Sequence, residues 1–166
     1  MHKIFLLYSW FIRTLFYFFH DIPLIMRLRG FLYSLFMKKR GNNLQVSASS
    51  IVKGLENLSI GNNCFFAANT NISASTDIYL EDDVMIGYAS ILESGNHTLK
   101  NGSYRFGAPK REPITIQFGS WVGANCVILA GANIPPSSCI AAGTSLGNKL
   151  PESGIYYRKS SLHCKK

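Results

Sequence analysis

The 166-residue sequence lacks the short motifs that mark several large enzyme classes. It has no G-x-x-x-x-G-K-[ST] motif, no G-x-G-x-x-G motif and no Ser/His/Asp order, so nucleotide hydrolysis and dinucleotide redox chemistry have no support. Its four cysteines and four histidines never take the spacing of a metal site. A zinc ion needs three or four ligands, and the middle of the chain offers one imidazole, His97. We therefore expect no metal ion.

Acidic side chains are also scarce, with nine Asp and Glu against 17 Lys and Arg and a net charge of +8. The excess is concentrated at the N-terminus, where residues 1–40 hold seven basic side chains and one acidic side chain, Asp21. A nucleic-acid-binding protein would carry a basic stripe along its main folded surface, so we expect no nucleic-acid partner. Positive charge on an aromatic, apolar end favours contact with an anionic membrane surface instead.

The sequence has no uninterrupted apolar run of membrane-spanning length. Residues 4–19 (IFLLYSWFIRTLFYFF) are strongly apolar, but Arg13 interrupts them. A helix of this length would measure about 24 Å, whereas the core of a bilayer is about 30 Å thick. No small-residue cleavage site follows, so a cleaved signal peptide is not expected. Pro23 suits the first turn of a second helix, predicted over about 23–38.

We assign residues 1–42 to an N-terminal apolar and basic helical segment, for which two interpretations are open. In the first, the segment lies on a membrane, with aromatic rings among the headgroups and Lys38-Lys39-Arg40 near anionic lipid. In the second, it is a helical cap over the open end of the domain that follows. Both can hold at once, and a single membrane-spanning segment is the less favoured alternative.

What the sequence does have is a period of six residues between Ile114 and Leu150. A branched apolar residue recurs at every sixth position, and a small residue follows each of the first five after four positions. The branched residues are Ile116, Val122, Ile128, Ile134, Ile140 and Leu146, and the small ones are Ser120, Cys126, Ala132, Ser138 and Thr144. Such a period is typical of parallel β-helices, in which three hexads form a triangular turn of about 18 residues around an inner core. We therefore predict a mainly β fold, a parallel β-helix over residues 43–152.

The same period is present upstream, with irregularities. It shifts by two residues at Leu58-Ser59-Ile60 and at Ile78-Tyr79-Leu80, and a similar element recurs at Ile114-Thr115-Ile116. We expect these three elements to mark equivalent corners of successive turns, each with a two-residue bulge. Residues 95–113 lack the period and are predicted to loop out of the coil, and a loop of this length is usually functional. Pro151 is predicted to end the repeat, leaving a basic tail over 153–166.

The four cysteines are expected to be structural or incidental. Cys64 and Cys126 take the small inward position of their hexads, where a thiol behaves as a small apolar group. Neither Cys139 nor Cys164 has a partner at a recognisable spacing. A reducing, cytosolic compartment is the simpler expectation.

His97 is the residue most open to a chemical role, because it stands where the last regular hexad gives way to the loop. The other histidines lie near the chain ends. On spacing alone, a lone histidine is as well explained by a structural role as by a catalytic one.

Residues 58–156 resemble the left-handed β-helix acyltransferases of the hexapeptide-repeat superfamily. In pattern they are most similar to sugar O-acetyltransferases, including the galactoside and maltose acetyltransferases and the enzymes that modify capsules and O-antigens. The matching segments are 58–63 (LSIGNN), 83–87 (DVMIG), Asn96-His97 with its loop, 113–116 (PITI), 121–125 (WVGAN) and 141–144 (AAGT). Residues 29–43 are similar to the helical, basic entry of polysaccharide-modifying relatives.

The resemblance implies a left-handed coil, a homotrimer with active sites between neighbouring subunits, and acetyl-CoA as co-substrate. It implies that His97 is the general base, with Glu93 and Asn96 on the acceptor side. Either Glu93 or a backbone carbonyl is a candidate to orient the imidazole ring. Residues implied to contact coenzyme A are Trp121, Gly123, Ala124, Ala142, Gly143, Asn148, Lys149 and Arg158. For the glycines and alanines, ordinary coil geometry is an equally good explanation, and Trp121 also suits a packed corner position.

The sequence departs from the family pattern at three places. An acceptor-binding Asn and Asp of the galactoside-type enzymes are replaced by Ala67 and Ala74, which argues against a simple galactoside or maltose acceptor. The usual Thr-Lys pair becomes Gly147-Asn148, with Lys149 one position late. The usual closing Gly-x-Pro-Ala becomes residues 158–161 (RKSS), so contacts to the nucleotide end of coenzyme A are in doubt there.

We therefore expect an acetyl-CoA-dependent O-acetyltransferase that modifies a sugar of a cell-surface polysaccharide or of its lipid-linked precursor. The alternatives are N-acylation of an amino sugar, acetylation of a xenobiotic, and a trimeric β-helix scaffold without turnover. The expected location is cytoplasmic, at the inner face of the cytoplasmic membrane, with residues 1–40 in peripheral contact with anionic lipid.

Overall fold

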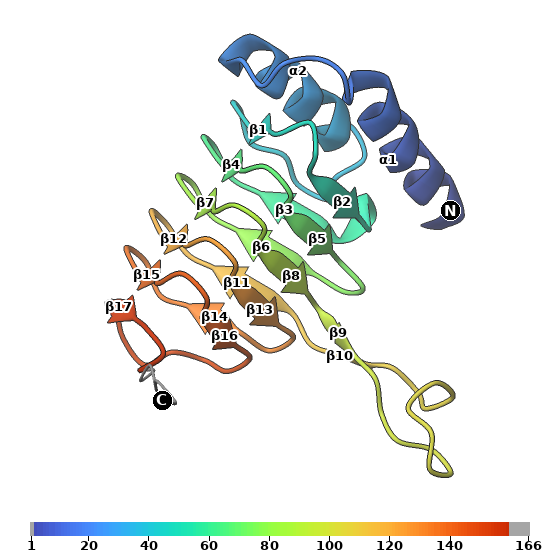
Figure 1. Ribbon diagram of the computed structural model, residues 1–166, viewed down its shortest axis with the longest axis vertical. Coiled ribbons are helices and arrows are strands. Elements are labelled where there is room, and N and C mark those ends of the chain that lie inside the picture. The colour runs from blue at the N-terminus through green and yellow to red at the C-terminus, as the bar shows by residue number, and fades with distance from the viewer. Residues whose placement is uncertain (1, 160–166) are drawn as a thin grey trace, which may run out of the picture.

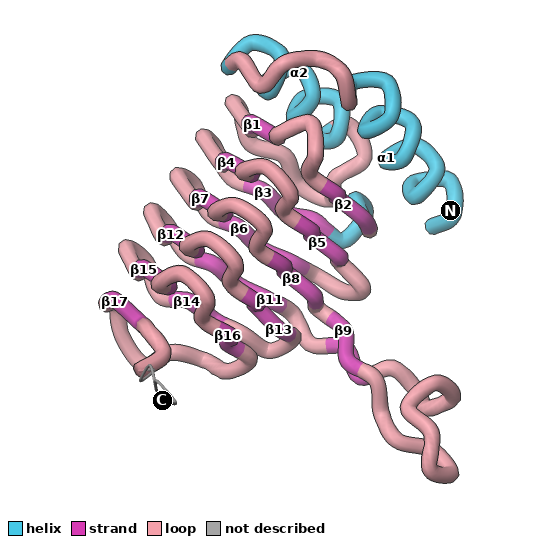
Figure 2. The backbone as a smooth tube through the Cα atoms, viewed as in Figure 1, coloured by secondary structure: helices cyan, strands magenta, loops and turns pink. Residues whose placement is uncertain are grey.

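The computed structural model describes residues 2–159. Two helices, α1 (His2–Phe16) and α2 (Pro23–Ser34), cover one end of a coil of short strands (Figure 1). A long loop projects sideways from the coil, and the C-terminal end of the described chain lies at the end opposite the helices. Figure 2 shows that strands and turns alternate on every coil. The predicted fold class, a left-handed parallel β-helix with an N-terminal helical segment, is confirmed.

The coil has three faces, each a parallel sheet, which we number in the order in which the chain visits them. The first face holds β1 (Gln45–Val46), β4 (Phe65–Phe66), β7 (Met85–Ile86), β12 (Trp121–Val122), β15 (Cys139–Ile140) and β17 (Ile155–Tyr156). The second face holds β2 (Ile51–Lys53), β5 (Asn71–Ser73), β8 (Ile91–Glu93), β13 (Val127–Leu129) and β16 (Ser145–Leu146). The third face holds β3 (Leu58–Ile60), β6 (Ile78–Leu80), β11 (Ile114–Ile116) and β14 (Asn133–Ile134).

The register between strands explains both the hexads and their irregularities. Trp121 pairs with Cys139, so the later turns repeat after 18 residues, as three hexads require. Phe65 pairs with Met85, so the earlier turns repeat after 20 residues. The two additional residues lie between the second and third faces, just before each I-x-I or L-x-I element. These elements are in register in β3, β6 and β11, which confirms that they are equivalent positions. They form the strands of one face, and the additional residues lengthen the corner before it.

The core is a continuous column of the predicted inward residues. The branched positions from Ile116 to Ile140 are fully buried, as are Ile60, Phe66 and Ile72. The small partners Ser120 and Cys126 are buried as well. Burial raises the pKa of the Cys64 thiol to about 11, in keeping with its predicted role as a small core residue. Cys164 lies outside the described residues.

Polar side chains define one of the corners. Asn43, Asn63 and Asp83 occupy the same place in successive turns, each with a positive φ of 55–61°. Few residues other than glycine adopt this left-handed conformation, but asparagine and aspartate do so more readily. The side-chain amide of Asn43 donates to Asn63 Oδ1 (2.9 Å), and that of Asn63 donates to Asp83 Oδ1 (3.0 Å). This ladder explains why the repeat tolerates polar residues here.

The helices cap the open end of the coil, as the second interpretation of residues 1–42 requires. α1 contacts β2 and the 3-10 turn η1 (Leu55–Asn57), and α2 contacts β1. Ile12 and Tyr33 belong to the same core cluster as the coil. Both helices are shorter than predicted, because α1 ends at Phe16 and α2 at Ser34. Within residues 2–159, no helix has the length and hydropathy needed to cross a membrane.

Two of the basic residues in the N-terminal segment are not available to a membrane. Arg29 is fully buried under α1, where Nη1 donates to Asp21 Oδ1 (3.0 Å) and to the carbonyl of Val46. Lys38 pairs with Asp77 at 2.9 Å. The following residue, Lys39, already bonds to the third face through the Leu58 carbonyl. The positive charge of this segment is therefore partly internal.

The coil continues beyond Pro151, which corrects the expected end of the repeat. β17 pairs with β15, with Ile155 beside Cys139, so the last turn is 16 residues long. The amide of Cys139 donates to the carbonyl of Gly154 (2.9 Å). A two-residue strand after a proline-rich turn has no hexad signature of its own, and the hydrogen bonds of β15 define it.

Candidate active site

The predicted loop over 95–113 is a hairpin that leaves the coil between the second and third faces, at what we call the second-to-third corner. Its base is an antiparallel pair, β9 (Gly95–Asn96) with β10 (Lys110–Arg111), and its tip projects away from the coil (Figure 1). The hydroxyl of the buried Ser94 donates to the carbonyl of Thr76 and accepts from its amide, both at 2.9 Å. His97 follows β9 directly, so the coil holds the root of the hairpin and presents this imidazole at the surface.

Three predicted site residues share one cavity at the root of the hairpin. A cavity of about 240 Å³ is lined by Ser75, Glu93, Gly95, Asn96, His97, Pro109 and Arg111. The catalytic candidate His97 therefore lies beside the acceptor-side candidates Glu93 and Asn96, as the sequence predicted.

The carboxylate of Glu93 is fixed by its own neighbours. Oε1 accepts from Ser75 Oγ (3.1 Å) and from the amide of Gly95 (3.0 Å). Between residues 2 and 159, no side chain or carbonyl bonds to the imidazole of His97, so neither of the two predicted orienting groups holds the ring in the isolated chain. The imidazole is exposed and available to a ligand or to a second chain.

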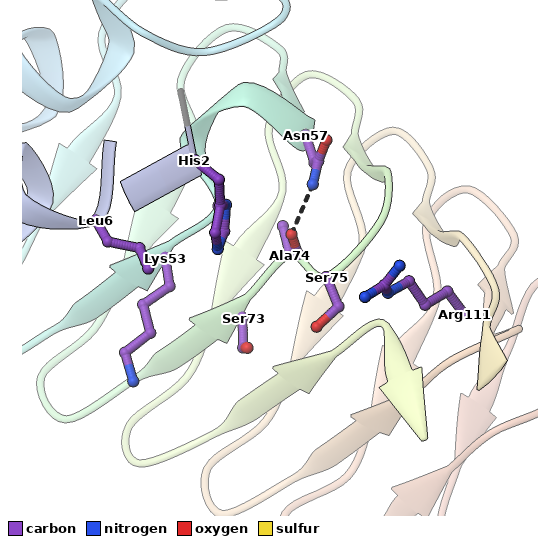
Figure 3. A pocket seen from close by; sticks show the side chains of 9 residues that line it. His2, Leu6, Lys53, Asn57, Ser73, Ala74, Ser75 and Arg111 are labelled. Carbon is purple, nitrogen blue, oxygen red and sulfur yellow. Dashed lines mark hydrogen bonds between the residues drawn. The ribbon is translucent and has the colours of Figure 1, made fainter. Parts of the chain in front are cut away.

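A second cavity continues from the first along the same corner. It measures about 410 Å³ and shares Ser75 and Arg111 with the His97 cavity. The residues that line it are His2, Leu6, Lys53, Gly54, Asn57, Ser73, Ala74, Ser75 and Arg111 (Figure 3). Ala74, which stands in place of an acceptor-binding residue in the sequence pattern, is buried in its wall.

Sequence reasoning missed most of this second cavity. Ser75 and Glu93 stand on successive turns, and the 18 to 20-residue period was a signal that placed them together. Arg111 had no such signal, because its position depends on the pairing of β10 with β9 across the hairpin.

The predicted coenzyme A residues gather at a different corner, between the first and second faces, which we call the first-to-second corner. Gly123 and Ala124 lie there after β12, and Ala142 and Gly143 lie there one turn later. Trp121 stands just before the corner, 47% exposed. These five residues form one continuous strip across two turns.

The two glycines of this strip have structural reasons of their own. A Cβ at Gly123 would lie 2.7 Å from the carbonyl oxygen of Ile140, so the stacking of the turns requires glycine. Gly143 has a φ of 75°, which disfavours other residues. These glycines are therefore explained by coil geometry, whereas the exposed Trp121 and Ala142 are not required by it.

No protein-family model matches the chain. A galactoside O-acetyltransferase of Lactococcus lactis is 24% identical over 104 residues, which cover 63% of this chain and 50% of that protein. The chain thus spans about half the length of this curated relative. A hexapeptide-repeat-containing acetyltransferase of Vibrio cholerae, complexed with acetyl coenzyme A, superposes with a TM-score of 0.80, 19% identity and coverage of 94% of this chain and 83% of that chain. A galactoside acetyltransferase in complex with coenzyme A gives a TM-score of 0.81 at 22% identity, over 94% and 77% of the two chains.

The chain has the fold of the hexapeptide-repeat acetyltransferases. The resemblance predicted from the sequence is thereby confirmed, since it covers the coil and the helical segment alike.

Within this acetyltransferase fold, one chain does not bring the two groups of site residues together. Every strand of the second face begins at the first-to-second corner and ends at the second-to-third corner. His97 therefore stands at one end of these strands, and Trp121, Gly123 and Ala142 stand at the other.

The remaining predicted residues are spread out. Asn148 and Lys149 are exposed on the side of the His97 hairpin, where the carbonyl of Asn148 accepts from Asn133 (3.4 Å). Arg158 is exposed two residues after β17. Each lies on a later turn than His97 and does not line its cavity. Among the described residues, no cluster of three or more His, Cys, Asp or Glu is arranged to hold a metal ion.

Proposed function

We propose that this protein is an acetyl-CoA-dependent O-acetyltransferase that modifies a sugar hydroxyl, with His97 as the general base. The observation that carries the proposal is the place of His97. An exposed imidazole lies beside a cavity, at the root of a hairpin anchored to a coil whose fold is shared with acetyltransferases bound to acetyl coenzyme A and coenzyme A.

The chemistry follows from an imidazole in that position. A neutral ring nitrogen of His97 takes the proton from the acceptor hydroxyl while the hydroxyl oxygen attacks the thioester carbonyl of acetyl-CoA. The C–S bond then breaks, and the thiolate of coenzyme A takes the proton from the imidazolium. Backbone amides at the corners are available to stabilise the oxyanion that forms in between. The role of this chain is to place the base and the acceptor, because the thioester already carries the activated acetyl group.

A neighbouring copy of the chain would complete the site in a homotrimer. Trp121, Gly123, Ala124, Ala142 and Gly143 lie at the opposite end of the second face from His97. In a cyclic assembly with head-to-tail contacts, each interface joins two different surfaces. The His97 corner of one chain then meets the Trp121 corner of the next, and the acceptor and the thioester meet between them.

The acceptor we propose is a cell-surface polysaccharide or its lipid-linked precursor, modified in the cytoplasm at the inner face of the membrane. The support comes from the outer faces of the helices. α1 exposes Ile4, Leu7, Phe11 and Leu15 along one stripe, and α2 exposes Leu24, Leu28 and Phe31 along another. Exposed apolar stripes beside lysines and arginines are typical of helices that lie in the interface of an anionic bilayer.

Acetyl transfer from labelled acetyl-CoA to a panel of surface glycans tests the proposal. We expect the His97→Ala variant to lose about 10²-fold or more of the rate, because a placed general base contributes about 10²–10⁴-fold. His20→Ala is the matched control, since His20 is exposed on the linker between the helices and lines neither cavity of the candidate site. An unchanged rate in His97→Ala would remove His97 from the mechanism, and no consumption of acetyl-CoA with any acceptor would leave a non-catalytic scaffold.

A further inference from the structure

The cavity that adjoins the His97 site has two cations on its rim. Lys53 ends β2, and Arg111 ends β10, the second strand of the hairpin base. Both side chains are exposed, and within residues 2–159 neither forms an ion pair with a carboxylate. In Figure 3 the guanidinium of Arg111 points toward Ser75, and His2 lies on the opposite side of the cavity.

The acidic residues nearby are already bound elsewhere. Glu56 does not line the cavity, and its Oε1 contacts the imidazole of His2. Glu93 lines only the His97 cavity, where Ser75 and the amide of Gly95 both donate to it. No carboxylate lines the larger cavity, so its charged lining is cationic.

The neutral lining suits a sugar. Ser73 and Ser75 supply hydroxyl groups from successive positions after β5, and Asn57 supplies an amide. The Asn57 side chain is fixed because Nδ2 donates to the carbonyl of Ala74 (2.9 Å), which leaves its oxygen available to a ligand hydroxyl. Leu6 of α1 contributes an apolar wall.

We propose that this cavity binds an acidic group of the acceptor, a carboxylate or a phosphate, through Arg111 and Lys53. The inference rests on the proposed function, and it defines the acceptor as an acidic sugar. Arginine binds carboxylate and phosphate groups with paired, charge-assisted hydrogen bonds, and lysine adds a second positive charge. Because the two cavities share Ser75 and Arg111, the acidic group lies one sugar ring or less from the hydroxyl presented to His97.

Three probes that differ only at carbon 6 test this proposal: methyl glucuronoside, methyl glucoside and methyl glucoside 6-phosphate. Their dissociation constants are measured by ligand-observed NMR on the full chain without acetyl-CoA. We expect an acidic probe to bind at least about tenfold more tightly than the glucoside, as one charge-assisted hydrogen bond allows. Tighter binding of the glucuronoside identifies a carboxylate acceptor, and tighter binding of the phosphate identifies a sugar phosphate.

The preference should disappear in Arg111→Met and weaken in Lys53→Met. Lys110→Met is the matched control, because Lys110 precedes Arg111 on β10 but pairs with Glu112 at 3.2 Å and does not line the cavity. Equal binding of all three probes by the native chain, or a preference that survives in Arg111→Met, would overturn the inference.

Acetyl transfer to the same probes is measured in parallel, so that the two proposals fail separately. Selective binding without transfer from acetyl-CoA to any acceptor would contradict the transferase and leave the acidic site standing. Transfer to a neutral sugar without any acidic preference would do the reverse.

Discussion

Arg29 shows how a single residue can join the helical segment to the coil. Its guanidinium is fully buried and reaches Asp21, the carbonyl of Val46 and, at 3.3 Å, the carbonyl of Phe19. Asp21 in turn accepts from the hydroxyl of Ser47 and from the amide of Ala48 (2.9 Å). One ion pair thus connects both helices, the linker between them and the first turn of the coil.

We predict that Arg29→Met destabilises the protein by about 3 kcal/mol, because it leaves Asp21 and several carbonyls without their donor. Urea denaturation followed by circular dichroism measures this loss. Arg27→Met, an exposed change on the same helix, should shift the free energy of unfolding by less than about 0.5 kcal/mol. Equal effects of the two substitutions would show that the buried pair does not stabilise the junction.

The same pair predicts a dependence of stability on pH. Partial burial opposes ionisation of Asp21, but the hydrogen bonds from Ser47, Ala48 and Arg29 and the charge of Arg29 outweigh it and lower its pKa. A carboxyl group with a lowered pKa in the folded state contributes stability above its ordinary pKa of about 3.9, and this contribution is lost as the pH falls through the folded value. The stability difference between native protein and Asp21→Asn should therefore be largest at neutral pH and shrink in acid. A difference that stays constant across this range would contradict the assignment.

At the scale of elements, α1 is apolar on two faces. Its inner face buries Ile12 and packs Tyr8 and Phe16 against the core cluster, while Leu7, Phe11 and Leu15 lie on the outer face with roughly half or more of their surface exposed. The cap and the membrane contact thus use different sides of one helix. Deletion of α1 would expose the end of the core, so substitutions on the outer face are the sharper test.

We predict that the combined change Leu7→Gln, Phe11→Gln and Leu15→Gln lowers binding to phosphatidylglycerol vesicles by at least about tenfold, since each apolar side chain gains about 1.5–3 kcal/mol on full burial. Vesicle flotation measures the binding, and the melting temperature should stay close to that of the native protein. Leu99→Gln with Phe106→Gln is the matched control, because both residues are exposed on the hairpin. Binding of the α1 variant at the native level would exclude this face as the membrane contact.

The elements also show what the sequence could and could not predict. A fixed period identifies the inward residues without knowledge of the fold, which is why Ile116 through Ile140 were correctly predicted as core. The burial of Arg29 could not be inferred, because it depends on a carbonyl of Val46 and on the carboxylate of Asp21 meeting in space. β17 and Arg111 were missed for the same reason, since hydrogen bonds to other segments define both positions.

At the scale of the whole molecule, the candidate site divides between two corners. The hairpin corner presents His97 with Glu93 and Asn96, and the first-to-second corner presents the strip from Trp121 to Gly143. A site assembled from both corners requires a second copy of the chain, so activity and assembly should be lost together. No feature of a single sequence places two surfaces of different chains against each other, and only the family resemblance suggested it.

Complementation between two inactive variants tests this composite site most directly. His97→Ala removes the base from one corner, and Ala142→Tyr obstructs the other at an exposed position. Each variant alone should assemble but transfer no acetyl group. When the two are refolded together in equal amounts, random assortment in a cyclic trimer should restore roughly a quarter of the native rate, because some interfaces then pair two intact corners. A mixture no more active than its components, with mixed trimers present, would contradict the account.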